Sequence, residues 1–210
     1  MTEPGPLKVG VTGGIGSGKS AVCLMLREFG APVLSADEIA REVSVRDSGA
    51  RANITRLLGP QSYLPDGSYN RRFVASRIFS SRTLQRKLER IVHPLVERRI
   101  AREVAQLDPR RSPIVVVEAA LVYESGLDRF LDIVVAVDAE EPVRLERVRR
   151  RDGAGSKDVR SRMKAQLPVE TKLHRADFVL VNNGTREELA VKVKFLYSLL
   201  QALATERKRP

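Results

Sequence analysis

The 210 residues are 42% hydrophobic and 30% charged, which excludes a disordered chain, and no apolar stretch reaches the roughly 20 residues of a membrane-spanning helix. The net charge of +11 favours polyanionic partners, although an aromatic content of 5% without tryptophan disfavours a surface that stacks nucleic-acid bases. One cysteine cannot form an intramolecular disulfide, so we expect a cytoplasmic protein.

The first half of the chain alternates short apolar runs with segments of helical spacing. In chain order, we predict a strand over 8–12, a helix over 21–29, a strand over 32–35 and a helix that begins at 36. Ser35 and Glu38 form the capping box that starts this second helix. After it, residues 49–106 are predicted to be helical and rich in arginine, with a turn at 65–67.

The second half continues the alternation. In chain order, we predict strands over 114–117 and 133–137, a helix over 141–151, a flexible break at 153–155, a helix over 159–173 interrupted at 168, and a strand over 177–181. Thr185 and Glu188 form a second capping box, and the helix after it carries an apolar face of Leu189, Val193, Leu196, Leu200 and Leu203. This alternation predicts an α/β fold with a mostly parallel sheet and helices on both of its faces.

We expect a single domain, residues 1–210, in three parts. A core over 7–48, 113–148 and 176–206 would carry the sheet. A helical insertion over about 49–112 and a small basic lid over about 149–175 would be attached to it. The single cysteine, Cys23, is expected to be a small residue of the core.

A glycine-rich motif lies between the first predicted strand and the first helix. Its sequence, Gly13-Gly-Ile-Gly-Ser-Gly-Lys-Ser20, satisfies the pattern G-x-x-x-x-G-K-[ST] of a P-loop NTPase. The glycines let backbone N–H groups point at phosphate oxygens, and the following helix adds the positive end of its dipole. We expect Lys19 to reach the β- and γ-phosphates as a catalytic residue, and Ser20 to bind Mg²⁺. The predicted nucleotide contacts from the loop are Gly14, Ile15, Gly16, Ser17, Gly18, Lys19 and Ser20.

The loop by itself leaves three classes of protein open: a small-molecule kinase, a GTPase and a nucleic-acid ATPase. A GTPase should carry Asn-Lys-x-Asp after a late strand, where this chain has Val181-Asn-Asn-Gly184. A nucleic-acid ATPase usually needs a larger core, and the charge is its only support. Size therefore favours a kinase.

Motifs along nearly the whole chain resemble the dephospho-coenzyme A kinase family. Besides the P-loop, they are Ala36–Glu42, Leu88–Pro94, Glu118–Glu124, Arg147 with Arg151, and Ala176 through Gly184. The resemblance implies transfer of the γ-phosphoryl group of ATP to the ribose 3′-hydroxyl of dephospho-coenzyme A, the final step of coenzyme A synthesis, with Mg²⁺ as cofactor. It implies that the helical insertion binds coenzyme A and that the lid bears arginines.

Other partners follow less directly from this resemblance. A kinase that phosphorylates a nucleoside monophosphate remains the alternative, as does a basic P-loop ATPase that binds nucleic acid. We expect no membrane partner, regard nucleic acid as disfavoured, and expect a monomer or a weak oligomer.

Asp37 matches the family's catalytic aspartate. It follows the second predicted strand, at the carboxyl edge of the sheet where α/β proteins bind ligands. There it could accept the proton of the attacking hydroxyl, although an acid in the first turn of a helix also complements the helix dipole.

The remaining acceptor residues are expected at strand ends and in the helical insertion. Arg71 and His93 match positions that the family uses near its substrate, although a histidine before Pro94 could instead pack between helices. Thr12 ends the first strand beside the expected acceptor site. Leu121 and Glu124 follow the third strand and complete the predicted acceptor contacts.

Arginines and a late loop are expected to complete the nucleotide site. Arg147 and Arg151 lie four residues apart on one helical face, which predicts a catalytic role for Arg147 and an ATP contact for Arg151. Asn182 and Gly184 resemble the loop that packs against adenine, although Asn-Gly is also an ordinary turn. Glu118 could hold Mg²⁺ through water together with Ser20. Glu118 and Glu124 could equally pair with neighbouring arginines.

The chain departs from the family's usual pattern in three places. Ser35 stands where an aspartate is usual, Ala120-Leu-Val-Tyr-Glu124 stands where Pro-Leu-Leu-Phe-Glu is common, and Arg144 stands where a glutamine is usual. None of these departures removes the P-loop or Asp37, so we expect an active enzyme.

Overall fold

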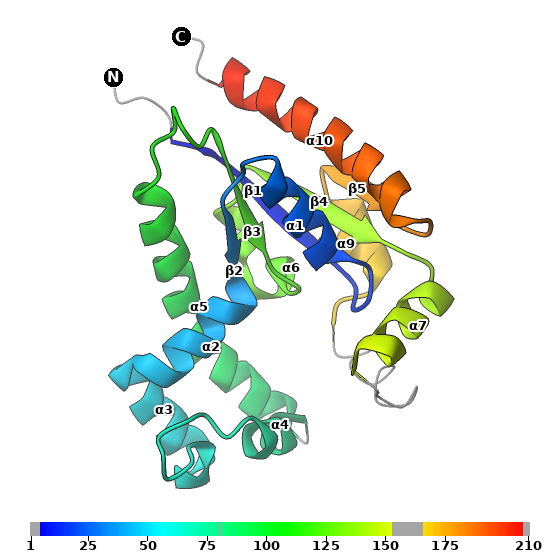
Figure 1. Cartoon of the computed structure of the whole chain (residues 1–210). Helices are drawn as coiled ribbons and strands as arrows, with labels where there is room; N and C mark the ends of the chain where they lie inside the picture. The colour runs from blue at the N-terminus through cyan, green and yellow to red at the C-terminus, as the bar shows by residue number, and fades with distance from the viewer. Residues whose placement is uncertain (1–4, 80, 153–165, 208–210) are drawn as a thin grey trace. The chain divides into compact units, whose positions relative to one another are not determined.

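The computed structural model describes residues 5–79, 81–152 and 166–207 (Figure 1). Its contacts divide the chain into two compact units: Met1–Ser35 with Val104–Pro210, and Ala36–Glu103. The second unit therefore begins before residue 49, where we expected the helical insertion to begin, and it contains the helix that bears Asp37. The predicted break at 153–155 lies outside the described residues, as do the first residues of the helix predicted over 159–173.

The first unit is built on a sheet of five strands. They are β1 (Leu7–Gly13), β2 (Val33–Ser35), β3 (Ile114–Glu118), β4 (Ile133–Asp138) and β5 (Phe178–Val181). The strand order is β2-β3-β1-β4-β5 and every neighbouring pair is parallel, so all carboxyl ends meet at one edge. β-Branched residues fill β3, whose first four positions are buried, as is typical of a strand covered on both faces. The predicted α/β fold and parallel sheet are confirmed.

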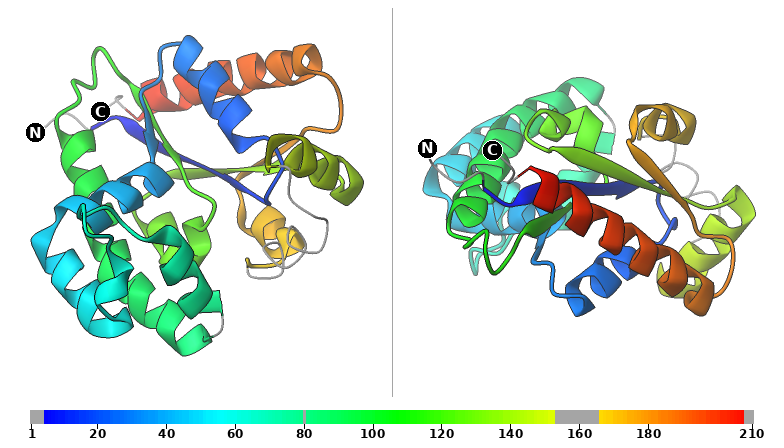
Figure 2. Two further views of the ribbon diagram at one scale, coloured as in Figure 1. Left: turned by 60° about the horizontal axis from the view of Figure 1, so that its bottom comes forward. Right: turned by 90° about the horizontal axis from the view of Figure 1, so that it is seen from above.

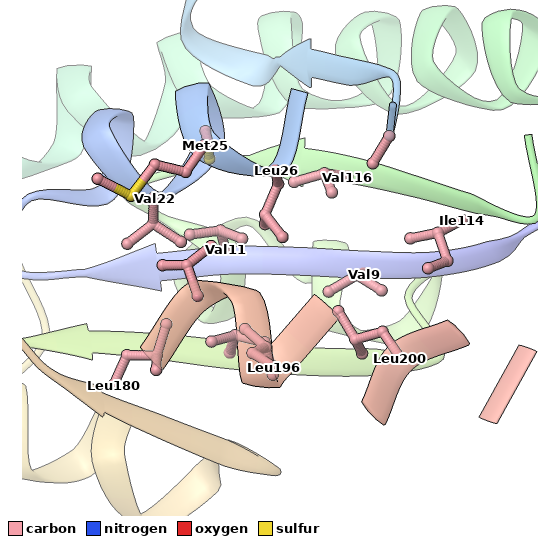
Figure 3. Close-up of a cluster of buried hydrophobic side chains, with 14 of the residues drawn as sticks. Val9, Val11, Val22, Met25, Leu26, Ile114, Val116, Leu180, Leu196 and Leu200 are labelled. Carbon is pink, nitrogen blue, oxygen red and sulfur yellow. The ribbon is translucent and has the colours of Figure 1, made fainter. Parts of the chain in front are cut away.

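Helices cover both faces of this sheet (Figure 2). α1 (Lys19–Glu28) and α10 (Arg186–Glu206) pack on one face, and α9 (Val169–Arg175) lies on the other. The core between the sheet, α1 and α10 includes Val11, Leu26 and Leu196 (Figure 3). α10 buries Leu189, Val193, Leu196 and Leu200 as predicted, and the capping box of Thr185 and Glu188 is present. Leu203 is only partly buried, and the next residue, Ala204, takes the core position.

Two further helices of this unit lie beside strand ends. α6 (Val122–Ser125) follows β3 and is continued by a 3-10 turn, η2 (Leu127–Arg129). α7 (Glu141–Asp152) follows β4, one residue longer than the helix predicted over 141–151. Among the described residues, no helix is both long enough and apolar enough to cross a membrane.

The second unit is helical and has its own small core. It contains α2 (Ala36–Arg46), α3 (Ser48–Leu58), a 3-10 turn η1 (Pro60–Ser62), α4 (Arg71–Phe79) and nearly all of α5 (Arg82–Ala105). The Tyr63 hydroxyl donates to the Ser44 carbonyl at 2.7 Å, and the Arg51 guanidinium lies 4.3 Å from the centre of the Tyr63 ring. Arg51 also donates to the carbonyl of Gly67, whose positive φ of 84° closes the predicted turn. The helical region predicted over 49–106 is thus divided into several helices, and Tyr63 contacts residues of α2 and α3.

Candidate active site

The P-loop follows β1 directly and needs its glycines for two separate reasons. Gly13, Gly16 and Gly18 have φ angles of 147°, 81° and 100°, which L side chains rarely adopt. A β-carbon at Gly16 would also meet the main-chain carbonyl of Arg144, and one at Gly18 would meet the side-chain amide of Asn182. Side chains are therefore excluded by both conformation and space, and phosphate oxygens could approach the backbone of the loop closely.

The ammonium of Lys19 lies across this loop. It donates to the carbonyl of Gly13 at 2.9 Å and to that of Gly14 at 3.0 Å. Because Lys19 is the first residue of α1, its charge adds to the positive end of the helix dipole. The loop therefore presents one full positive charge together with oriented amides, which suits a phosphate group.

Ser20 and Glu118 are brought together across the sheet edge. The Ser20 hydroxyl donates to Glu118 Oε1 at 2.7 Å. Glu118 is the last residue of β3 and stands in register with Val11 on β1 and Ser35 on β2. Among the described residues, no cluster of three or more His, Cys, Asp or Glu side chains could hold a metal ion. One hydroxyl and one carboxylate nevertheless fit Mg²⁺, which commonly takes its other oxygens from water and substrate phosphates.

Asn182 joins the P-loop to the loop after β5. Its side-chain amide donates to the Ser17 carbonyl at 2.8 Å, and Asn182 is only 5% exposed. Arg147, from α7, donates to the Asn182 carbonyl at 2.9 Å. Its guanidinium thus lies on the P-loop side of α7, which the helical spacing did not predict. Arg151 is exposed in the last turn of the same helix.

Gly184 has a local structural role in addition to its predicted one. A β-carbon there would overlap the carboxylate of Glu188, which accepts the Thr185 N–H of the capping box at 3.3 Å. The glycine therefore makes room for the start of α10. Asn183, its neighbour, exchanges hydrogen bonds with Glu140 at 2.8 and 3.0 Å and so fixes the same loop to the end of β4.

Arg144 covers the outer side of the P-loop. A β-carbon at Gly14 would meet its guanidinium and the side chain of Val169 on α9. Arg144 Nε is buried and has no hydrogen-bond partner within the described chain. The departure at this position therefore places a second cation next to the loop, which the sequence pattern alone did not indicate.

A buried lysine that we did not predict as a site residue joins Thr12 and Glu124. Lys172, on α9, donates to the Ala120 carbonyl at 2.7 Å and pairs with Glu124 Oε1 at 2.9 Å. The Thr12 hydroxyl, fully buried, reaches the same carbonyl at 3.5 Å. The Leu167 N–H also donates to Glu124 Oε1, at 3.0 Å. Glu124 therefore pairs with a lysine and not with an arginine as the sequence left open.

The spacing of α9 held a signal for this lysine. Positions 169, 172 and 176 follow the 3- and 4-residue steps of one helical face, and Val169 and Ala176 are apolar. A lysine on this apolar face must either be buried with a partner or extend its ammonium beyond the face to solvent. Leu121, by contrast, is the half-buried residue that precedes α6 and carries no polar side chain.

Three predicted site residues lie in the second unit, on three different helices. Asp37 is exposed in the first turn of α2, two residues after β2 ends. Arg71 is the exposed first residue of α4. His93 is half-buried in α5, and burial lowers the pKa of its imidazole below the ordinary value, against the opposing charge of Glu89. A half-buried imidazole whose charged form is disfavoured agrees with the packing role that we left open for His93.

Cys23 is a core residue, as expected. It is 2% exposed within the cluster that packs α1 on the sheet. Burial is the main cause that raises the pKa of its thiol far above the ordinary range, so the thiolate nucleophile is suppressed.

The parallel sheet, the glycine-rich loop after its central strand and the serine–carboxylate pair are those of a P-loop NTPase. The model of the dephospho-CoA kinase family matches residues 7–188. A dephospho-CoA kinase of Anaeromyxobacter dehalogenans is 41% identical over 193 residues, 92% of each chain. The chain belongs to the dephospho-CoA kinase family.

Solved structures agree with this assignment. A crystal structure from Thermus thermophilus has a TM-score of 0.81 and 34% identity, and the match covers 94% of this chain and 99% of that one. The dephospho-CoA kinase of Campylobacter jejuni shares the fold, with a TM-score of 0.69 and 23% identity over 93% of this chain and 98% of that one.

Proposed function

We propose that this chain transfers the γ-phosphoryl group of ATP to the 3′-hydroxyl of the ribose in dephospho-coenzyme A. Membership of the family supports a dephospho-CoA kinase of coenzyme A synthesis. The observation that carries the phosphoryl-transfer chemistry is the P-loop with Lys19 across it and Ser20 bonded to Glu118 at 2.7 Å. This arrangement provides one cation for the phosphates and two oxygen ligands for a divalent ion.

The nucleotide would be held by the backbone and by side chains of the first unit. The amides from Gly14 to Ser20 would surround the β- and γ-phosphates, with Lys19 as their counter-charge. Asn182 and Gly184 would lie against the adenine, and Arg151 would contact ATP. Arg147 would stabilise the charge that develops on the transferred group, and its bond to the Asn182 carbonyl would orient it.

Mg²⁺ is the cofactor that this donor set fits. Ser20 would hold it directly and Glu118 through water, as their contact supports. When bound, the ion neutralises negative charge on the β- and γ-phosphate oxygens.

The acceptor would be held by the residues that the family resemblance assigns to it. Asp37 would accept the proton of the 3′-hydroxyl as general base. Arg71 would pair with the pyrophosphate of the acceptor, and His93 would contact it. Thr12, Leu121 and Glu124 would line the acceptor side of the first unit. We therefore assign coenzyme A binding chiefly to the helical part, 49–112, and an arginine-bearing lid to about 149–175, of which residues 153–165 lie outside the described chain.

The test is ADP release by the purified full chain with ATP and Mg²⁺, coupled to an optical readout. Dephospho-coenzyme A is compared with adenosine and with nucleoside monophosphates, and Lys19→Ala is the control for contaminating kinases. Turnover only with dephospho-coenzyme A, to a product phosphorylated at the 3′ position, supports the proposal. Turnover only with a nucleoside monophosphate would overturn the acceptor, and steep salt-dependent binding to duplex DNA would favour the nucleic-acid alternative.

The assay also tests the expected oligomeric state. We expect the specific activity to be the same at all protein concentrations, because a monomer or a weak oligomer needs no partner copy for activity. A cytoplasmic location stays a prediction.

A further inference from the structure

Lys172 is the only charged residue among the buried residues of the described chain. Its side chain is 1% exposed, whereas its partner Glu124 is 19% exposed. Burying an ammonium costs several kcal/mol unless it is paired and hydrogen-bonded, so a lysine rarely occupies such a position for packing alone. The pair with Glu124 and the bond to the Ala120 carbonyl supply that compensation.

The pair leaves hydrogen-bonding capacity unused. An ammonium has three N–H donors, and within the described residues Lys172 meets two acceptors. Glu124 Oε1 accepts from Lys172 and from the Leu167 N–H, but Glu124 Oε2 is buried with no partner in the described chain. Buried carboxylate oxygens are almost always paired, so this oxygen needs a partner that the described chain does not supply, either a water molecule or a bound ligand.

The position of this oxygen points to the phosphoryl acceptor. Ala120 lies two residues after Glu118. Its carbonyl accepts hydrogen bonds from the Lys172 ammonium and from the hydroxyl of Thr12, at the end of β1. Glu118 in turn bonds Ser20 of the P-loop. The Lys172–Glu124 pair is therefore tied to the carboxyl ends of β1 and β3, where the transferred group and its acceptor meet in a parallel α/β site.

We propose that Lys172 is a positioning residue for the acceptor. By binding Glu124 Oε1 and the Ala120 carbonyl, it fixes the Glu124 carboxylate so that Oε2 accepts a hydrogen bond from an O–H or N–H group of the acceptor. This inference rests on the proposed function for its ligand, but the ion pair itself can be tested without turnover. Lys172 does not touch the substrate, so its removal acts through Glu124.

The experiment is a double-mutant cycle with Lys172→Met, Glu124→Gln and the double variant. KM for dephospho-coenzyme A, KM for ATP and urea unfolding are measured for each. Lys172→Met leaves an unpaired buried carboxylate, whereas the double variant removes both charges and should unfold at nearly the wild-type urea concentration. We expect the acceptor KM to rise about tenfold or more in all three variants, the size of one lost hydrogen bond to a charged group. The ATP KM should stay within about twofold of wild type.

Lys194→Met is the matched control. It makes the same chemical change as Lys172→Met, but at an exposed position of α10. Loss of an exposed charge should leave all three measurements nearly unchanged.

The double variant decides between positioning and packing. If its stability returns while the acceptor KM stays high, Lys172 positions the acceptor through Glu124. If the stability and the acceptor KM both return to wild-type values, the lysine serves only folding and the proposal is wrong. The proposal is also wrong if the KM for ATP rises while the acceptor KM does not. If the wild-type protein does not phosphorylate dephospho-coenzyme A, the proposed function is wrong. Calorimetric titration with the same compound then tests the acceptor site without turnover. Equal affinity of the wild type and the double variant for this compound would overturn the inference.

Discussion

The two units of the chain offer different kinds of groups to negatively charged ligands. The first unit, Met1–Ser35 with Val104–Pro210, offers backbone amides on a loop whose glycines are fixed by φ and by close neighbours. The second unit, Ala36–Glu103, offers side chains: fourteen Lys and Arg against eight Asp and Glu give a net +6 of the chain's +11. Backbone recognition demands one conformation, whereas charge on exposed side chains tolerates many. The P-loop should therefore be sensitive to small changes, whereas the exposed arginines of the second unit should tolerate them better.

The largest effect should come from Asp37→Asn, because it removes the one proposed chemical group of the second unit. If Asp37 is the general base, kcat should fall by roughly 10²–10⁴-fold while the KM for ATP changes little. Steady-state kinetics with saturating substrates measures both. Glu38→Gln, in the same first turn of α2, is the control, because glutamine also serves in a capping box. Full kcat in Asp37→Asn would remove the base assignment and leave the aspartate a helix-dipole role.

The second-largest effect should come from Arg147→Ala, which alters the nucleotide side of the first unit. Arg147 donates to the Asn182 carbonyl at 2.9 Å, so its loss should disturb the loop that we propose lies against the adenine. We expect kcat/KM for ATP to fall about tenfold or more, in keeping with a lost charged hydrogen bond, with acceptor affinity unchanged. Arg150→Ala provides the comparison, because Arg150 lies on the same helix, is 81% exposed and pairs with Glu146. Loss of acceptor affinity alone would show that Arg147 belongs to the other substrate.

Ser35→Asp should sharpen the metal assignment. Ser35 is in register with Glu118, so an aspartate there would place a second carboxylate next to the one that bonds Ser20. Half-maximal activation should shift to lower Mg²⁺ by roughly two- to tenfold, which is at most about 1.4 kcal/mol. Ser35→Asn is the control, since it is an equally good helix cap without the charge. Both variants should keep the free energy of unfolding within about 0.5 kcal/mol, and identical Mg²⁺ titrations for Asp and Asn would show that the position only caps α2.

The smallest effect should be the pH dependence that His93 gives to stability. Burial lowers the pKa of this imidazole, so the folded chain prefers it neutral. Its contribution is fully present above the unfolded pKa near 6.5 and is lost as the pH falls through the lower folded value. Urea unfolding of His93→Gln should therefore be less pH-dependent between pH 5 and 7 than that of wild type. His174→Gln, an exposed position, controls for loss of an imidazole. An unchanged slope in His93→Gln would show that other groups cause the acid sensitivity.

Local sequence patterns determined much of this protein. The strand-loop-helix context of Gly13 to Ser20, the alternation of β-branched runs with helices, and the capping box at Thr185 and Glu188 each depend on neighbours within a few residues. All three appear in the structure as predicted. The family resemblance rests on the same kind of short motif, repeated along the chain.

Only the tertiary structure decided which side chains meet. Lys172 and Ala120 are 52 residues apart, and Arg147 and Ser17 are 130 apart. No helical or strand period links such pairs, because their approach depends on the strand order β2-β3-β1-β4-β5 and on how α7 and α9 pack against it. The sequence therefore indicated Glu124 as a site residue but could not supply its partner, since a buried ion pair forms only where the whole fold removes water from both charges.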